Sequence, residues 1–75
     1  MPFPLPALTP KQVIRALKKA GFFVHHQRGS HAILKHPQRP QRVTVTVHNR
    51  DLKRRTLSSI IKQSGLTRDE FVKRL

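Results

Sequence analysis

The chain has 75 residues, which is enough for one compact domain and too few for two. It contains no cysteine, so disulfide frameworks and thiolate zinc sites are excluded and packing alone must stabilise the fold. Sixteen Lys and Arg residues stand against three Asp and Glu residues, and the resulting formal charge of +13 predicts a nucleic acid, an acidic protein or both as partners.

The first eight residues (1–8) are predicted to form a Pro-rich extended arm in front of a folded domain at residues 9–75. Three prolines constrain the backbone of the arm and leave Phe3 and Leu5 available to lie on a surface. The arm has no early Lys or Arg and no continuous apolar stretch, so we do not expect a signal peptide. No apolar run approaches the roughly 20 residues that cross a bilayer. We therefore expect a cytoplasmic protein that does not bind membranes.

A helix is predicted from about Pro10 to Ala20. Thr9 is its expected N-cap, Pro10 suits the first helical position, and Gly21 can close the helix in a left-handed turn. The apolar residues of this segment share one stripe of a helix: Val13, Ile14, Leu17 and Ala20.

Three strands are predicted to follow. Aromatic and β-branched residues favour a strand at 22–28, and Gly29-Ser30 is typical of a turn into a second strand at 31–35. Two prolines bracket the next connection, after which valines alternate strictly with polar residues at 43–48. The valines are predicted to face the core and the threonines to face outward.

Two further helices complete the predicted order α-β-β-β-α with a short C-terminal helix. The second helix follows the polar loop 49–51, ends at Gly65, and should pack through Leu57, Ile60 and Ile61. The third starts at a capping box in 67–70 and should pack through Phe71, Val72 and Leu75. This pattern predicts an α+β fold.

Several motifs occur in an order and spacing that chance does not readily produce. They are Gly21-Phe22, Gly29-Ser30-His31, His36-Pro37, Val43-Thr44-Val45, Asp51-Leu52-Lys53 and the segment Thr56–Leu66. In these motifs, over about residues 10 to 75, the chain closely resembles the HicA toxins. It departs from them in the Pro-rich arm and in His25-His26, where a basic residue is commoner.

The resemblance implies a fold like a double-stranded-RNA-binding domain, with the helices on one face of a three-stranded antiparallel sheet. It also implies an endoribonuclease that cleaves mRNA, inhibits translation and growth, and is neutralised by an acidic, HicB-like antitoxin. The histidine of the family's Gly-Ser-His motif falls on His31, which is therefore the expected catalytic residue.

Histidine suits RNA cleavage, which requires a base for the 2′-OH proton, an acid for the leaving 5′ oxygen and positive charge at the phosphate. Its unperturbed pKa of about 6.5 keeps both protonation states accessible near neutral pH. Strand alternation predicts that His31 and Lys35 share an outer face with Thr44 and Thr46, which would set His31 beside a phosphate-binding cation. Without the resemblance, a polar histidine at a hairpin would be the more natural interpretation.

The candidate RNA-binding residues are Gly29, Ser30, Lys35, Lys53, Arg54 and Arg55. Gly29 can serve a turn that needs positive φ or allow close approach of a phosphate. Ser30 can be a turn residue, a donor to phosphate or a partner of the imidazole. Residues 53–55 crowd positive charge at the start of a helix, where the helix dipole disfavours it. A bound anion would compensate them, although a solvated basic loop is the alternative.

The other histidines, His25, His26, His36 and His48, do not predict a metal site. No pair has helical zincin spacing, and the whole chain has only three carboxylates. We therefore expect neither a metal nor a small-molecule cofactor. For His36 and His48 three roles remain open: binding phosphate, satisfying a loop, or acting as the second proton-transfer group.

Other functions share the same charge and fold. A non-catalytic RNA-binding module would not need His31, and a pure interaction protein would be inactive outside a complex. A DNA-binding domain is disfavoured because the second helix devotes its apolar residues to packing. The chain lacks Tyr and Trp, and of its four phenylalanines Phe22 and Phe71 are predicted in the core, so sequence preference should be weak.

Overall fold

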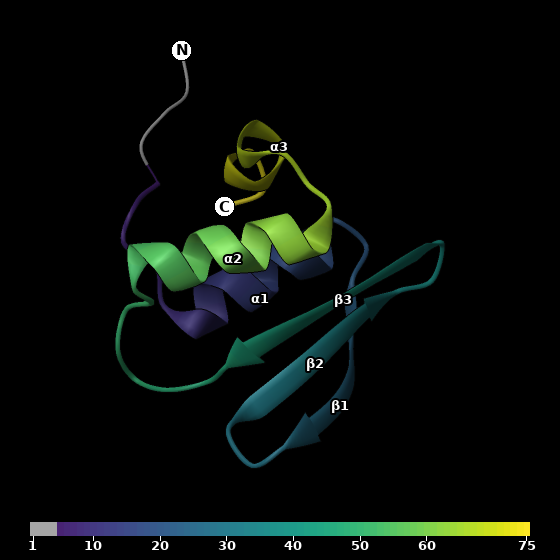
Figure 1. The fold of residues 1–75 in the computed structure, drawn as a ribbon, viewed down its shortest axis with the longest axis horizontal. Helices are drawn as coiled ribbons and strands as arrows, with labels where there is room; N and C mark the ends of the chain where they lie inside the picture. The colour runs from purple at the N-terminus through teal and green to yellow at the C-terminus, as the bar shows by residue number, and fades with distance from the viewer. Residues whose placement is uncertain (1–4) are drawn as a thin grey trace.

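Two helices cover one face of a three-stranded antiparallel sheet, and a short third helix follows them (Figure 1). The computed structural model describes residues 5–75, so Phe3 and the rest of residues 1–4 lie outside the described residues. The elements are α1 (Pro10–Lys19), β1 (Phe23–Arg28), β2 (His31–His36), β3 (Arg39–Thr46), α2 (Arg54–Ser64) and α3 (Arg68–Val72). The predicted α+β order is confirmed.

The helix ends follow their local chemistry. Thr9 and Gln12 form a capping box at the start of α1, and Gly65 ends α2 with a φ of +76°. Thr67 and Glu70 form a second capping box at α3, as predicted. The backbone N–H of Thr67 donates to Glu70 and lowers the pKa of that carboxyl.

The third strand differs from its prediction. β3 begins at Arg39 and leaves a turn of only two residues, 37–38, so Pro40 lies inside the strand. The missing N–H of Pro40 is tolerated because β3 is an edge strand in the order β1-β2-β3. At the same edge, the amide oxygen of Gln63 on α2 accepts from Thr44 N–H at 3.3 Å.

The two faces of the sheet are sharply different. Ala32, Leu34, Val43 and Val45 are at most 1% exposed and form the inner face. The side chains that alternate with these point away from the helices and form what we call the outer face: His31, Ile33, Lys35, Arg42, Thr44 and Thr46. The predicted alternation is therefore confirmed.

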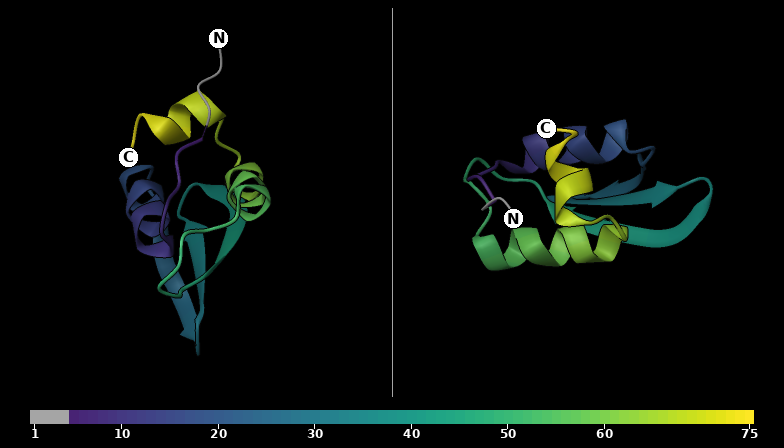
Figure 2. Two further views of the ribbon diagram at one scale, coloured as in Figure 1. Left: turned by 90° about the vertical axis from the view of Figure 1, so that its left-hand side faces the viewer. Right: turned by 90° about the horizontal axis from the view of Figure 1, so that it is seen from above.

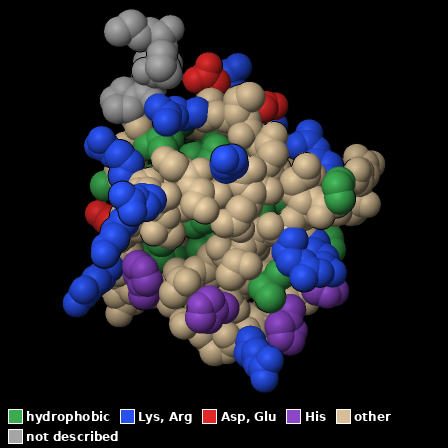
Figure 3. Space-filling model, viewed as in Figure 1, with side chains coloured by type: hydrophobic (Ala, Val, Ile, Leu, Met, Phe, Trp, Pro, Cys, Tyr) green, Lys and Arg blue, Asp and Glu red, His purple; other side chains and the backbone are tan. Residues whose placement is uncertain are grey.

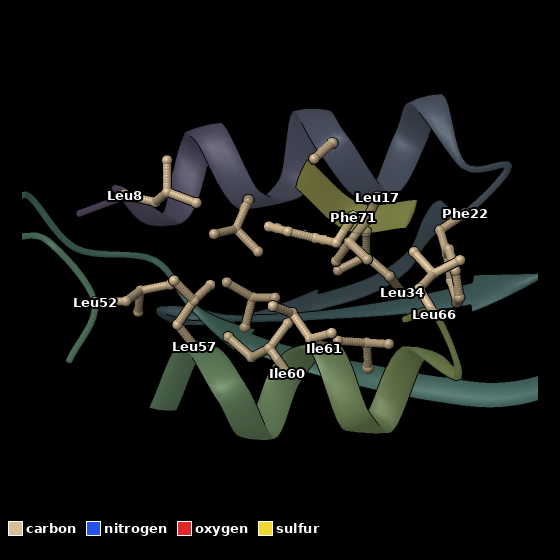
Figure 4. Packing of buried hydrophobic residues seen from close by; sticks show 14 of the residues in the cluster. Leu8, Leu17, Phe22, Leu34, Leu52, Leu57, Ile60, Ile61, Leu66 and Phe71 are labelled. Carbon is tan, nitrogen blue, oxygen red and sulfur yellow. The ribbon is translucent and has the colours of Figure 1, made fainter. Parts of the chain in front are cut away.

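The core fills the space between the inner face, α1 and α2 (Figure 4). Figure 2 shows the two helices running alongside each other, with α3 crossing them on the side away from the sheet. Phe71 brings α3 into the core with no exposed surface, whereas Leu75 is exposed, contrary to prediction. None of the helices within residues 5–75 is long and apolar enough to span a membrane.

The described part of the arm contributes to this core. Residues 5–9 form neither helix nor strand, but Leu5 and Leu8 are buried. The N–H of Leu52, in the loop between β3 and α2, donates to the Leu8 carbonyl at 2.8 Å. Leu8 and Leu52 therefore close the end of the core together (Figure 4).

Candidate functional site

His31 begins β2 immediately after a two-residue turn, Gly29-Ser30. Gly29 has a φ of +57° and no non-glycine residue of the described chain has a positive φ, which is the pattern of a type II′ hairpin turn. A Cβ added to Gly29 would meet nothing within 4 Å, so the turn, rather than crowding within the protein, accounts for the glycine. The whole turn and His31 are exposed.

The outer face presents three rows of side chains, one residue from each strand. The first row is Phe23, Lys35 and Arg42, the second is His26, Ile33 and Thr44, and the third is Arg28, His31 and Thr46. His31 thus shares the outer face with Lys35, Thr44 and Thr46, as predicted.

The two-residue turn places Arg28 on the outer face opposite His31, and a β-bulge lies further back in β1. The register shifts between Val24 and His26, so His25 has no partner in β2. Because of this extra residue, Phe23 at the start of β1 and Arg28 at its end both face outward although they are five positions apart. Lys35, the cation expected beside His31, lies four residues along β2, or roughly 13 Å away. Arg28 was not predicted as a site residue, although the two-residue turn already implies its pairing with His31.

The charge of this region has one sign. No Asp or Glu occurs between residues 23 and 46, so the strands and their turns carry cations and histidines only. Figure 3 shows His, Lys and Arg side chains gathered over the sheet end of the molecule, while the acidic ones in that view lie toward α3 and at one edge. Such a surface attracts a polyanion.

A hollow of about 410 Å³ adjoins the third row. It is lined by Thr46 and His48 at the end of the sheet, by the loop residues Arg50, Asp51 and Leu52, and by Lys53 and Thr56 at the start of α2. Val47 N–H donates to the Ser30 carbonyl at 2.6 Å, which continues the β2–β3 pairing past the end of the strand. His48 therefore follows shortly after the end of β3, where Thr46 pairs with His31.

His36 and His48 have the same local hydrogen bond but different surroundings. In each, Nδ1 accepts from the backbone N–H two residues later at 3.1 Å, which leaves the proton of the neutral ring on Nε2. Nε2 of His36 lies 3.2 Å from the Ala20 carbonyl at the end of α1, so this histidine satisfies a loop. Among the described residues, no hydrogen bond engages Nε2 of His48.

The basic cluster at 53–55 divides between different parts of the surface. Lys53 lines the hollow beside Thr46, whereas Arg54 lines a separate pocket together with Leu5, Pro6 and Ala7 of the arm. Arg55 is exposed and lines neither. Lys53 is also the N-cap of α2, where no side chain caps the helix and no acidic residue lies in the first turn.

The residues brought together are therefore the turn 29–30, His31 and Arg28 on one side, and Thr46, His48 and Lys53 on the other. Lys35 belongs to the far end of the outer face. Within residues 5–75, no three His, Asp or Glu side chains lie close enough together to hold a metal ion.

Comparison with known protein families gives a match over most of the chain. The model of a family described as the HicA toxin of bacterial toxin-antitoxin matches residues 10–66, a span that includes all three strands, α1 and α2. No curated protein matches the chain.

Proposed function

Because the chain belongs to the HicA family of toxins of bacterial toxin-antitoxin systems, we propose that its toxic activity is cleavage of mRNA by His31. The observation that carries the proposal is the placement of His31. It is an exposed histidine on a sheet whose strands carry no carboxylate, held between Arg28 and Thr46 by the pairing of three strands. A group that transfers protons at an RNA phosphate needs this accessibility and this neighbouring positive charge.

In the proposed reaction the 2′ oxygen attacks the adjacent phosphorus as it loses its proton, and the bond from phosphorus to the 5′ oxygen breaks as that oxygen gains one. The products are a 2′,3′-cyclic phosphate and a 5′-hydroxyl. His31 carries one of these two proton transfers. Arg28, opposite it, stabilises the charge that gathers on the phosphate oxygens.

His48 is proposed as a fixed donor to the same phosphate. In the neutral ring, the hydrogen bond that Nδ1 accepts from Arg50 N–H places the proton on Nε2. Nε2–H is therefore presented as a hydrogen-bond donor beside the hollow. Of the three roles open to His48, binding phosphate is the one that this geometry supports.

The proposed RNA-binding residues are the turn and the cations around it: Gly29, Ser30, Lys35, Lys53, Arg54 and Arg55. The exposed turn offers close approach to the backbone, Lys53 lines the hollow, and Lys35 extends the positive charge along the outer face. Most of the affinity should be electrostatic and independent of sequence.

The partner that neutralises the toxin is proposed to be an acidic, HicB-like protein acting in the cytoplasm, where mRNA is translated. The positive surface around His31 supports this, because an acidic partner would associate quickly with it and compete with RNA phosphates.

The test is incubation of the purified protein with a labelled single-stranded RNA, with and without EDTA. Cleavage by the wild-type protein that is lost in His31→Ala supports the role of His31. Cleavage that persists in the presence of EDTA supports a reaction without a metal. Tight RNA binding without cleavage by the wild-type protein would instead identify a non-catalytic RNA-binding module.

A further inference from the structure

Phe23 is exposed on the outer face, at the opposite end from His31. Its exposed fraction is 44%, and among residues 5–75 Leu75 is the other large apolar side chain with comparable exposure. A single exposed apolar side chain is ordinary on a protein surface. Phe23 differs from such a residue in its neighbours.

The row that contains Phe23 is otherwise cationic. Phe23 lies opposite Lys35, and Lys35 lies opposite Arg42, so an aromatic ring is followed across the sheet by two positive charges. The absence of carboxylates from residues 23–46 leaves those charges unneutralised by the strands themselves. Single-stranded nucleic acids bind to this combination, because cations hold the phosphates while bases stack on aromatic rings.

The ring of Phe23 is not needed by the core. Its neighbour Phe22 fills that role, being 3% exposed and in edge contact with the His36 ring at 5.1 Å between centroids. Phe23 turns the other way and makes an edge contact with His25, the bulge residue, at 6.3 Å between centroids. This packing orients Phe23 at the surface instead of burying it.

We propose that Phe23 is a base-stacking subsite for unpaired RNA, and that the bound strand runs along the outer face from Phe23 to His31. The inference rests on the proposed function, since it names the form of RNA that this site accepts. The spacing of roughly 13 Å along β2 separates the stacked base from the cleaved bond by a short run of nucleotides. Because every base has a π face, the subsite selects unpaired strands without selecting a sequence.

The test measures binding of full-length protein to RNA that carries 2′-fluoro groups, which lacks the attacking hydroxyl and is not cleaved. Four variants are compared with the wild type: Phe23→Ala, Phe23→Leu, Phe23→Trp and the matched control Leu75→Ala. The ligands are a mixed-sequence single strand, the same strand with abasic riboses, and the corresponding duplex.

Phe23→Ala should weaken single-strand binding roughly tenfold or more, the effect of removing the stacking of one base. Phe23→Leu should bind the single strand nearly as weakly as Phe23→Ala, because leucine has apolar area but no ring on which a base can stack. Phe23→Trp should bind at least as tightly as the wild type, and Leu75→Ala should bind with wild-type affinity. Duplex affinity should not depend on Phe23, and abasic strands should bind the wild type and Phe23→Ala alike. The salt dependence should also stay the same, because every cation that binds a phosphate is still present.

Wild-type single-strand affinity in Phe23→Ala, or full affinity in Phe23→Leu, would overturn the proposal. Unchanged RNA binding combined with weaker capture of the acidic antitoxin would show that Phe23 docks a protein instead. The two proposals are tested separately, because this binding assay uses RNA that cannot be cleaved. Failure of the wild-type protein to cleave ordinary RNA would refute the nuclease proposal, whereas the base-stacking proposal is decided by the binding measurements alone.

Discussion

Arg28 and His31 lie opposite each other at the two ends of the Gly29-Ser30 turn. The pairing follows from the two-residue turn, which places the residue before it opposite the residue after it. A guanidinium and an imidazole are thereby held side by side at an exposed corner of the sheet. The first two predictions concern the chemistry at this corner.

His31→Ala and His31→Gln should abolish RNA cleavage and growth inhibition while leaving the fold intact, because His31 is exposed and contributes nothing to the core. RNA affinity should fall only slightly, since phosphate contacts elsewhere supply most of it. Cleavage of labelled RNA, thermal unfolding and binding are measured in parallel. Cutting at the wild-type rate by either variant would contradict the assignment.

His48→Ala should reduce the cleavage rate by roughly 10² because it removes a donor to the phosphate, whereas His48→Gln should recover much of that rate. The amide nitrogen of glutamine can take the position of Nε2 but cannot transfer protons. Both limbs of the pH–rate profile should survive in His48→Gln. Loss of one limb in that variant would identify His48 as a proton-transfer group instead.

Neutralising Lys53, Arg54 and Arg55 together should weaken binding to RNAs of every sequence. The salt slope of log K should fall by roughly 0.7 for each phosphate that is no longer neutralised. Single variants should rank Lys53→Gln as the most damaging to cleavage, because Lys53 alone of the three lines the hollow next to Thr46. A changed cleavage motif at unchanged affinity would mean that these residues contact bases.

The acidic antitoxin should cover His31 and the neighbouring cations, so that neutralisation and loss of RNA access have one cause. An interface that buries roughly 800 Å² on the toxin is sufficient. High salt should slow association more than it speeds dissociation. Variants of Arg28 and Lys53 should weaken the complex along with RNA binding. A complex that leaves His31 exposed and still cleaves RNA would exclude occlusion.

Leu8→Ala should destabilise the domain by about 2 kcal/mol or more, because Leu8 is 5% exposed and packs with Leu52. Pro6→Ala, at an exposed position of the same arm, is the matched control and should have little effect. The free energies of unfolding from urea titration provide the comparison. Equal stability of the two variants would show that the arm adds nothing to the core.

Much of this structure could be predicted because it depends on local signals. Helix caps at Thr9 and Thr67, the turn at Gly29-Ser30 and the alternating valines of β3 each follow from neighbouring residues. These signals also placed His31 on the outer face. The beginning of β3 was missed because Pro40 normally interrupts strands, and only its edge position makes it acceptable.

The arrangement around His31 was harder to predict because it depends on long-range pairing. The bulge at His25 leaves no pattern in the sequence, yet it decides that Phe23 faces outward on the same side as Arg28. The different roles of His36 and His48 follow from the Ala20 carbonyl, which is close to one ring and not to the other. Leu75 was assigned to the core from helical spacing, but α3 ends at Val72, before that residue.

The hydrogen bond from Leu52 to Leu8 also bears on the order in which the protein folds. Its two partners flank α1 and the whole sheet in the chain, so closing it requires ordering of everything between them. The β1–β2 turn that carries His31 needs only adjacent residues and can form early during synthesis. The hairpin can therefore form before residue 52 has been synthesised, whereas this end of the core closes only once Leu52 is in place.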